Sequence, residues 1–332
     1  MIKGIHHVAI CVDDIKSATN FYLHTAQLEI ENDADQLGLP ILPGTSEATM
    51  LRGANARLRL IALNHLAVQT NGRAANTAEP MRPVSKAGIT HFCLQAPEIK
   101  ALYLQFAIAG ATFHSDPVDL GTGFLYCYSR DLEANVVELE GVPRLWDDPR
   151  PWFAHVSLST PDIERLSAFY SGVLEQPAIR SGPLGPNRRL DQVAGLHNVE
   201  LKAAWIPAQN IQIEVMQYFQ PPTTPKSLDE RAWAELATQA GYCYICFEVT
   251  DAQNALDYLL SLGATQTPAM ATLSGGHLAF CADPDGNLLL LLSLSSEAQS
   301  FSIAHLDDPF IGTRMTEMRQ AQSLNQEQRK AS

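Results

Sequence analysis

The sequence predicts an α+β protein built from four copies of one unit. Three observations support this fold class: four strand-like segments align without gaps, a helical stretch follows each of them, and a further strand closes each unit. Self-similarity of this kind is typical of one supersecondary unit used repeatedly. The four opening segments are HVAICVDDI from His7, HFCLQAPEI from His91, HVSLSTPDI from His155 and YICFEVTDA from Tyr244.

Each unit begins with a strand that leads into a helix. Apolar residues alternate with others in the opening segments, and β-branched residues are frequent, which indicates strands with one buried face. Where each strand gives way to its helix, a carboxylate can complement the free N–H groups of the helix N-terminus. We expect these acids to be structural: Asp14, Glu98, Asp162 and Asp251. The closing strands are expected at residues 56–63, 135–141, 211–218 and 286–293.

The length and the connections indicate the domain organisation. A chain of 332 residues is long enough for about two domains, and turn-rich or polar stretches separate the four units. We expect an N-terminal domain at residues 1–148, a C-terminal domain at residues 149–300 and a polar helical tail at residues 301–332.

Composition excludes several classes of function. A formal charge of −13 and a pI near 5.2 argue against nucleic acid or an anionic membrane as a partner, because phosphate binding needs clustered Lys and Arg. No signal-peptide pattern opens the chain, and the longest aliphatic run, at residues 288–294, is far shorter than the ~20 residues that span a bilayer. We therefore expect a cytoplasmic protein, with its six cysteines reduced and buried.

The units resemble the βαβββ modules of the vicinal oxygen chelate superfamily. This group contains glyoxalase I, methylmalonyl-CoA epimerase, the bleomycin resistance proteins and the type I extradiol dioxygenases. The resemblance covers residues 1 to about 300. It implies four modules paired into two cupped, barrel-like sheets, in which two modules hold one divalent metal by ligands from their first and last strands.

Reading those ligand positions off the four modules gives two residues per module. They are His7 and Arg59, His91 and Glu138, His155 and Glu214, and Tyr244 and Leu290. Pairing modules one and two predicts a metal site of His7, His91 and Glu138, and leaves modules three and four with a degenerate site. His6 is then expected to point to the opposite face of its strand. Two imidazoles and a carboxylate suit Fe(II), which we favour, and also Mn(II), Zn(II) or Co(II).

A different pairing stays open. If modules two and three share a sheet, then His91, Glu138, His155 and Glu214 form a four-ligand site, and module one pairs with module four. We prefer the first pairing because each half alone has the length and order of a two-module member of the superfamily.

Two residues are candidates for catalysis. The stretch LYCYSRDLEANVVE partly resembles the extradiol dioxygenase signature, with Tyr128 placed to donate to a substrate oxygen. It departs from that signature at Leu132 and Ala134, which replace a proline and a glycine, and the upstream DLGTGF lacks the expected histidine. Arg59 is expected to clamp a substrate anion, to pair with Glu138 or to reach solvent.

Three functions remain open. The first is an Fe(II) dioxygenase that cleaves an oxygen-chelating aromatic or 2-oxo acid substrate. The second is a glyoxalase- or epimerase-like lyase or isomerase that acts through an enediolate. The third is a non-catalytic, resistance-type protein that binds a small molecule. In each case the partner is a small oxygen-chelating molecule, and the chain is expected to be a monomer or a homodimer.

Overall fold

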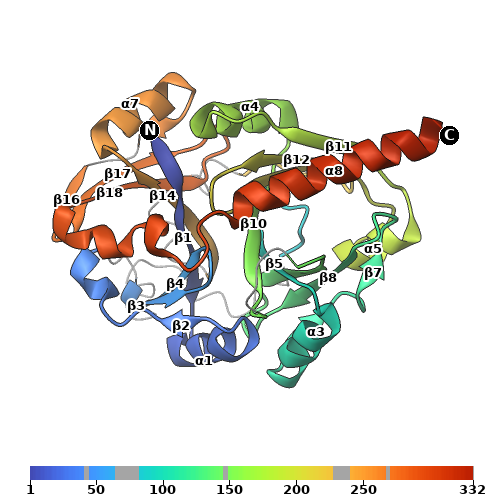
Figure 1. Ribbon diagram of the computed structural model, residues 1–332, viewed down its shortest axis with the longest axis horizontal. Helices are drawn as coiled ribbons and strands as arrows, with labels where there is room; N and C mark the ends of the chain where they lie inside the picture. Colours follow the sequence, from blue (N-terminus) through green and yellow to red (C-terminus); the bar gives the residue numbers. More distant parts are fainter. Residues whose placement is uncertain (41–44, 64–81, 145–148, 227–239, 267–269, 332) are drawn as a thin grey trace.

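The computed structural model describes residues 1–40, 45–63, 82–144, 149–226, 240–266 and 270–331, with side chains to residue 321. Within these residues, two curved sheets of nine strands each carry helices, which confirms the predicted α+β class (Figure 1). Both sheets are open rather than closed into barrels. Figure 1 shows the first strands, in blue, and the last strands, in orange, in one sheet and the middle of the chain, in green and yellow, in the other.

The first sheet, called here the module 1–4 sheet, has the strand order β15-β17-β18-β14-β1-β4-β3-β2, with β16 paired to β17. Its strands are β1 (Ile2–Val12), β2 (Glu29–Ile30), β3 (Thr45–Arg52), β4 (Arg57–Leu63), β14 (Gly241–Val249), β15 (Thr265–Gln266), β16 (Ala271–Leu273), β17 (Gly276–Ala282) and β18 (Leu288–Leu294).

The second sheet, called the module 2–3 sheet, has the order β11-β12-β13-β10-β5-β9-β8-β6, with β7 paired to β8. Its strands are β5 (Gly88–Ala96), β6 (Thr112–Phe113), β7 (Val118–Asp119), β8 (Leu125–Arg130), β9 (Val136–Gly141), β10 (Trp152–Ser159), β11 (Ile179–Leu184), β12 (Glu200–Pro207) and β13 (Gln212–Gln220).

The pairing of modules one with two and three with four is therefore wrong, and the alternative is observed. Antiparallel pairing of β1 with β14 joins modules one and four, and pairing of β5 with β10 joins modules two and three. Each sheet combines one module from before the expected domain boundary with one module from after it. Neither residues 1–148 nor residues 149–300 therefore form a separate domain with its own sheet. The boundary itself falls at residues 145–148, outside the described part of the chain.

Helices cover one face of both sheets and share one apolar core. Three of the four expected acids cap their helices, since Asp14, Asp162 and Asp251 each accept a backbone N–H, whereas Glu98 makes no such bond. The core joins both sheets, and in it the ring of Phe21 lies 5.4 Å from that of Phe106. The helices of this core are α1 (Ile15–Thr25), α3 (Ile99–Ile108), α4 (Ile163–Leu174) and α7 (Ala252–Ser261), whereas the shorter α5 (Arg188–Ala194) packs in a separate cluster with Tyr128.

Tyrosine–aspartate bonds connect successive modules across the two sheets. The Tyr22 hydroxyl of α1 donates to Asp131 at 2.7 Å, and the Tyr170 hydroxyl of α4 donates to Asp283 at 2.8 Å. Asp131 also accepts the backbone N–H of Asn135, so it organises the turn before β9. The two sheets are thus interlocked, because modules one and two, and likewise modules three and four, lie in different sheets and remain bonded to each other.

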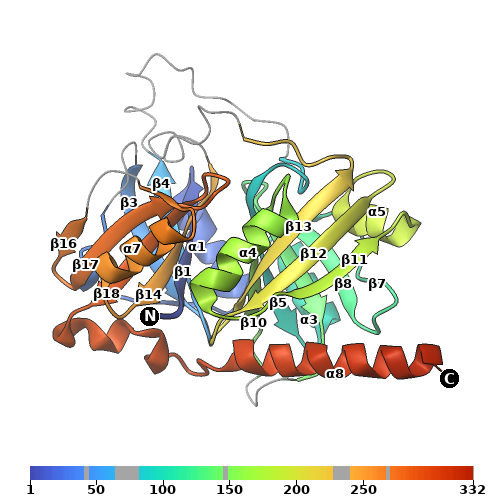
Figure 2. The same ribbon diagram turned by 90° about the horizontal axis from the view of Figure 1, so that it is seen from above.

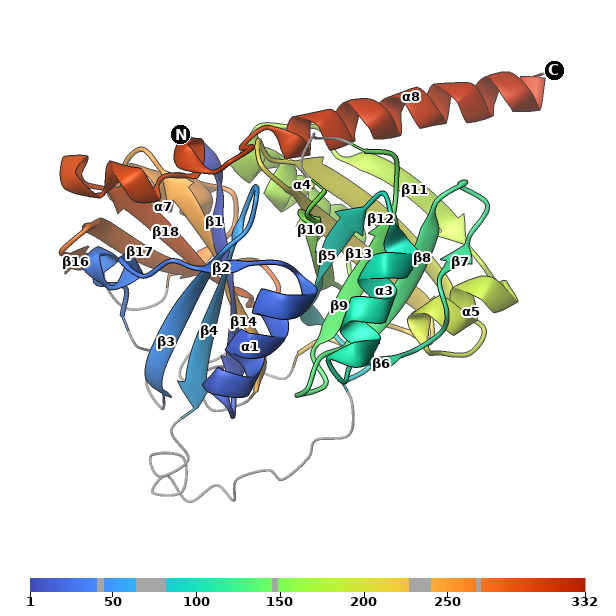
Figure 3. The same ribbon diagram turned by 60° about the horizontal axis from the view of Figure 1, so that its bottom comes forward.

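The chain ends in a long helix, α8 (Ile311–Ala331), which follows two short 3-10 segments, η3 (Ser296–Phe301) and η4 (Ile303–His305). Figures 2 and 3 show α8 running from the junction of the sheets along the module 2–3 sheet. Its start is buried rather than polar, since Ile311 and Met315 pack with Trp152. No helix in the described ranges is both long and apolar enough to cross a membrane. All six cysteines are free and buried, as predicted.

Candidate metal centre

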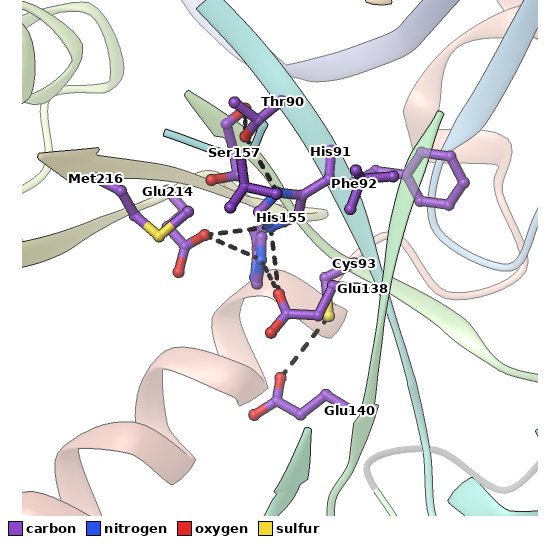
Figure 4. Close-up of polar contacts among 12 residues, drawn as sticks. Thr90, His91, Phe92, Cys93, Glu138, Glu140, His155, Ser157, Glu214 and Met216 are labelled. Carbon is purple, nitrogen blue, oxygen red and sulfur yellow. Dashed lines mark hydrogen bonds and ion pairs between the residues drawn. The ribbon is translucent and has the colours of Figure 1, made fainter. Parts of the chain in front are cut away.

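Four buried side chains converge on the face of the module 2–3 sheet opposite helices α3 and α4 (Figure 4). They are His91 on β5, Glu138 on β9, His155 on β10 and Glu214 on β13, and their ligand atoms all lie within 4.8 Å of one another. His155 Nε2 lies 2.9 Å from Glu138 Oε2 and 3.3 Å from Glu214 Oε2. His91 Nε2 lies 3.4 and 3.5 Å from the same two oxygens.

The strand order explains this convergence. β5 and β10 are antiparallel neighbours at the centre of the sheet, and each has a parallel partner, β9 and β13, on its outer side. The two histidines therefore come from the central strands and the two carboxylates from the strands that flank them. Side chains on one face of four adjacent strands can meet at a single point when the sheet curves toward that face.

The electrostatics of the cluster are balanced within it. The four residues are at most 7% exposed, and burial disfavours every charged form. For His91 that penalty is outweighed by the nearby carboxylates of Glu138 and Glu214, which raise its pKa to about 9. For Glu138 and Glu214, burial is likewise outweighed, by the two imidazoles, and the pKa of each carboxyl is lowered. With two ionised carboxylates and one protonated histidine, the buried cluster carries a net negative charge that a cation would neutralise.

The residues fit a divalent ion. Among the described residues, His91 Nε2 and Glu214 Oε2 are buried and have no hydrogen-bond partner, and both atoms face the centre of the cluster. Native proteins rarely leave such atoms unpaired unless a ligand or ion meets them. Two nitrogen and two oxygen donors suit Mn(II), Fe(II), Co(II), Ni(II) or Zn(II). The Thr90 hydroxyl lies 3.1 Å from His91 Nδ1, the kind of contact that orients a metal-binding imidazole.

Tyr128 lies beside the cluster, as its proposed role requires. Its ring centroid is 4.9 Å from that of His91, and it stands directly opposite Glu138 in the pairing of β8 with β9. Burial raises the pKa of Tyr128 well above its ordinary value, so the phenol keeps its proton and can donate it in a hydrogen bond.

His7 and Arg59 lie in the other sheet. His7 Nε2 lies 3.1 Å from the Tyr244 hydroxyl, and Arg59 Nη1 donates to the same oxygen at 2.8 Å. Leu290, the fourth equivalent position, belongs to an apolar cluster that also contains Tyr244. The structure does not bring His7 or Arg59 together with His91 and Glu138. Because Arg59 places a positive charge beside His7, this position is unfavourable for a cation.

His6 does not point away from His7 as expected. The pairing of β1 with β14 shifts register between Ile5 and His7, and the two Nδ1 atoms lie 2.8 Å apart. His6 Nε2 lies 3.0 Å from the Phe301 carbonyl and must donate to it, so His6 Nδ1 accepts from His7 Nδ1. His7 Nε2 must then accept from Tyr244. Every ring nitrogen is used in a neutral pair, consistent with burial lowering the pKa of both histidines.

Of the predicted site, the structure unites His91, Glu138 and Tyr128. The preferred pairing missed His155 and Glu214, although the alternative contained them. A signal was present in the sequence: the preferred pairing buries Glu214 opposite Tyr244 and Leu290, with one histidine as its counterpart. A carboxylate is costly to bury under those conditions.

The protein consists of two interlocked sheets of repeated modules, and modules two and three share a His/Glu cluster. These features define a metalloenzyme-like vicinal oxygen chelate fold. The family model described as Glyoxalase/Bleomycin resistance protein/Dioxygenase superfamily matches residues 4–139 and 152–291. The chain belongs to this superfamily, whose members are mostly metal-dependent enzymes, and the resemblance seen in the sequence is confirmed.

Solved structures agree with this assignment of the fold. Glyoxalase I from Zea mays is 15% identical with a TM-score of 0.61, and the match covers 91% of this chain and 96% of the maize chain. A putative dioxygenase from Bacillus subtilis is 12% identical with a TM-score of 0.56, covering 92% and 90% of the two chains. A search of curated proteins found no match.

Proposed function

We propose that this protein is a divalent-metal-dependent lyase or isomerase that moves a proton beside a chelated carbonyl, through an enediolate. The observation that carries the proposal is the four-ligand cluster of His91, Glu138, His155 and Glu214. An octahedral ion held by four side chains keeps two open positions, which a substrate with two neighbouring oxygens can fill. An ion bound there would supply a Lewis acid that stabilises negative charge on those oxygens.

The residues around the cluster supply the rest of this chemistry. The Tyr128 phenol, protonated across the neutral range, orients a substrate oxygen by donating a hydrogen bond. A proton acceptor has to be an anionic group near the substrate carbon, and the carboxylates of Glu138 and Glu214 are placed for that role. Their lowered pKa values keep them ionised at neutral pH, which is the form that can accept a proton, while the same lowering makes each a weak base as long as it faces the two imidazoles.

An Fe(II) dioxygenase ranks second. It is favoured by Tyr128, which lies beside His91 at a spacing that resembles the extradiol signature. It fits the four-ligand set less well, because a chelating substrate and dioxygen together need three open positions. Non-catalytic binding ranks third and differs from both enzymes by the absence of turnover.

The test combines metal analysis with two reaction assays. Protein purified without oxygen is assayed for metal, and then incubated in D2O with 2-oxoaldehyde hemithioacetals and malonyl-type thioesters while proton NMR follows exchange at the carbon beside the carbonyl. An oxygen electrode follows the same protein with catechols and 2-oxo acids. Exchange without oxygen uptake supports the proposal, whereas oxygen uptake matched to product supports the dioxygenase.

A matched pair of variants locates the proton acceptor. Glu214→Gln keeps a ligand oxygen but cannot accept the proton, so metal content should persist while exchange falls by more than about 100-fold. Glu98→Gln, at an exposed helix start, should leave both unchanged. If Glu214→Gln exchanges normally, Glu138 becomes the acceptor to test in the same way.

A further inference from the structure

A second group of buried polar residues lies one step along the strands from the candidate metal centre. Glu140 follows Glu138 on β9, and Gln212 precedes Glu214 on β13. Because β9 and β13 run in opposite directions, through the antiparallel pair β5 and β10, both steps lead to the same end of the sheet. Two residues along a strand span about 7 Å, so this group lies within reach of a molecule bound at the metal centre.

These residues present polar atoms that the described chain does not satisfy. Glu140 Oε1 and Gln212 Oε1 are buried acceptors without a partner, and their residues are 1% and 0% exposed. Trp205 of β12 lies directly opposite Glu214, and its Nε1 is a buried donor that also lacks a partner. Glu140 uses its other oxygen to accept from Gln95 at 2.5 Å. Three unpaired polar atoms at one end of the sheet are costly unless a ligand meets them.

Helix α8 forms the wall behind this group. The Thr316 hydroxyl accepts from Gln212 Nε2 at 3.1 Å, and the Arg319 guanidinium lies over the Trp205 ring, 4.6 Å from its centroid. Arg319 also lies 3.7 Å from Glu140 Oε2. Thr316 and Arg319 are three residues apart and so share one face of the helix. In Figure 4 the pale red helix passes beside Glu138 and Glu140.

We propose that this group is a subsite for a neutral, hydroxyl-bearing arm of the substrate, with α8 as its wall. The proposal rests on the proposed function, because the reacting oxygens of the same molecule would chelate the metal. A hydroxyl group donates one hydrogen bond and accepts others, so it can satisfy one of the two unpaired acceptors together with the unpaired donor. The charges of Glu140 and Arg319 offset each other, so a neutral group fits better than a charged one.

The test measures binding of two hydroxamates of the same length to the Co(II)-loaded protein through its visible absorption spectrum. Hydroxamates chelate divalent metals through two oxygens. 4-Hydroxybutanohydroxamate carries a terminal hydroxyl, and pentanohydroxamate has a methyl group in its place. We expect the hydroxylated compound to bind at least about tenfold more tightly, which corresponds to about 1.4 kcal/mol.

Three variants attribute this preference to the subsite. Gln212→Leu removes one acceptor and Arg319→Met removes the stacked cation, and each should reduce the ratio of the two Kd values toward one while leaving the Kd of pentanohydroxamate nearly unchanged. Glu317→Gln, exposed on the same helix, should keep the ratio of the unmodified protein.

The outcomes separate the two proposals. Equal affinities in the unmodified protein mean that ordered water alone fills the subsite, which overturns this inference and leaves the metal-dependent function standing. A preference that survives both Gln212→Leu and Arg319→Met also overturns it, because the hydroxyl is then recognised elsewhere. Failure of Co(II) and of both hydroxamates to bind overturns the proposed function together with the inference.

Discussion

The proton on His91 and a metal ion compete for the same nitrogen. With its pKa raised to about 9 by Glu138 and Glu214, the ring is protonated at neutral pH in the metal-free protein. A ligating imidazole must be neutral, so binding of an ion at pH 7 should release about one proton. Affinity should rise by up to about tenfold per pH unit and level off near pH 9. Calorimetric titration in buffers of different ionisation enthalpy measures this release.

The same shift links pH to stability of the metal-free fold. The folded pKa of His91 lies above its ordinary value of 6.5, so protonation stabilises the fold fully below 6.5, and that contribution is lost as pH rises through about 9. A metal-free protein whose free energy of unfolding is constant from pH 6.5 to 9 would contradict the ion pairing described here.

Single substitutions distinguish the two sets of predicted ligands. Glu138→Ala and Glu214→Ala should each lower metal affinity by more than about 100-fold, since even changes outside the ligand set cost 10–100-fold. His7→Ala should leave the number of bound ions unchanged, because its ring nitrogens are committed to His6 and Tyr244. Competition with a chromogenic chelator gives the affinities. If Glu138→Ala lost metal affinity and Glu214→Ala kept it, the result would favour a three-ligand site that does not include Glu214.

At the scale of the element, the first strand of module one is held by hydrogen bonds rather than by metal. Tyr244→Phe removes the hydroxyl that Arg59 donates to and that His7 accepts from. Two buried polar groups then lose a partner, and the free energy of unfolding should fall by about 1–3 kcal/mol. Urea denaturation measures the change. Tyr103→Phe, whose hydroxyl bonds Asp116 at an exposed position, should cost under about 0.5 kcal/mol.

The elements were more predictable from sequence than their partners. The alignment of the four opening strands located His91 and His155, because strand periodicity is a local property of the chain, whereas Glu140, Gln212 and Trp205 carried no such local signal. The choice of neighbours for β1 and β5 is not local. The antiparallel partner of β1 is β14, which lies more than a hundred positions further along the chain. Only the charge requirement of Glu214 carried that information, and it competed with the simpler expectation that adjacent modules pair.

At the scale of the whole molecule, neither half should bind metal alone. Residues 1–144 contain His91 and Glu138, and residues 149–331 contain His155 and Glu214, so each half contributes two ligands. We expect the separately produced halves to show little metal affinity and the co-expressed halves to recover one ion per pair. Metal analysis after size-exclusion chromatography measures this. Full binding by the first half as a monomer would favour the pairing that the structure does not show.

The position of β14 also determines when the protein can be completed during synthesis. β1 is synthesised first, whereas its antiparallel partner β14 is synthesised late, as the pairing of Ile2 with Val249 shows. The module 2–3 sheet, by contrast, needs only residues up to Gln220 and can form while the last module is still being translated. The candidate metal centre should thus assemble before the sheet to which the N-terminus belongs. During that interval the apolar β1 strand has β4 on one side but lacks β14 on the other, and this open edge is exposed to wrong association. The late arrival of module four is therefore the step most in need of protection by a chaperone.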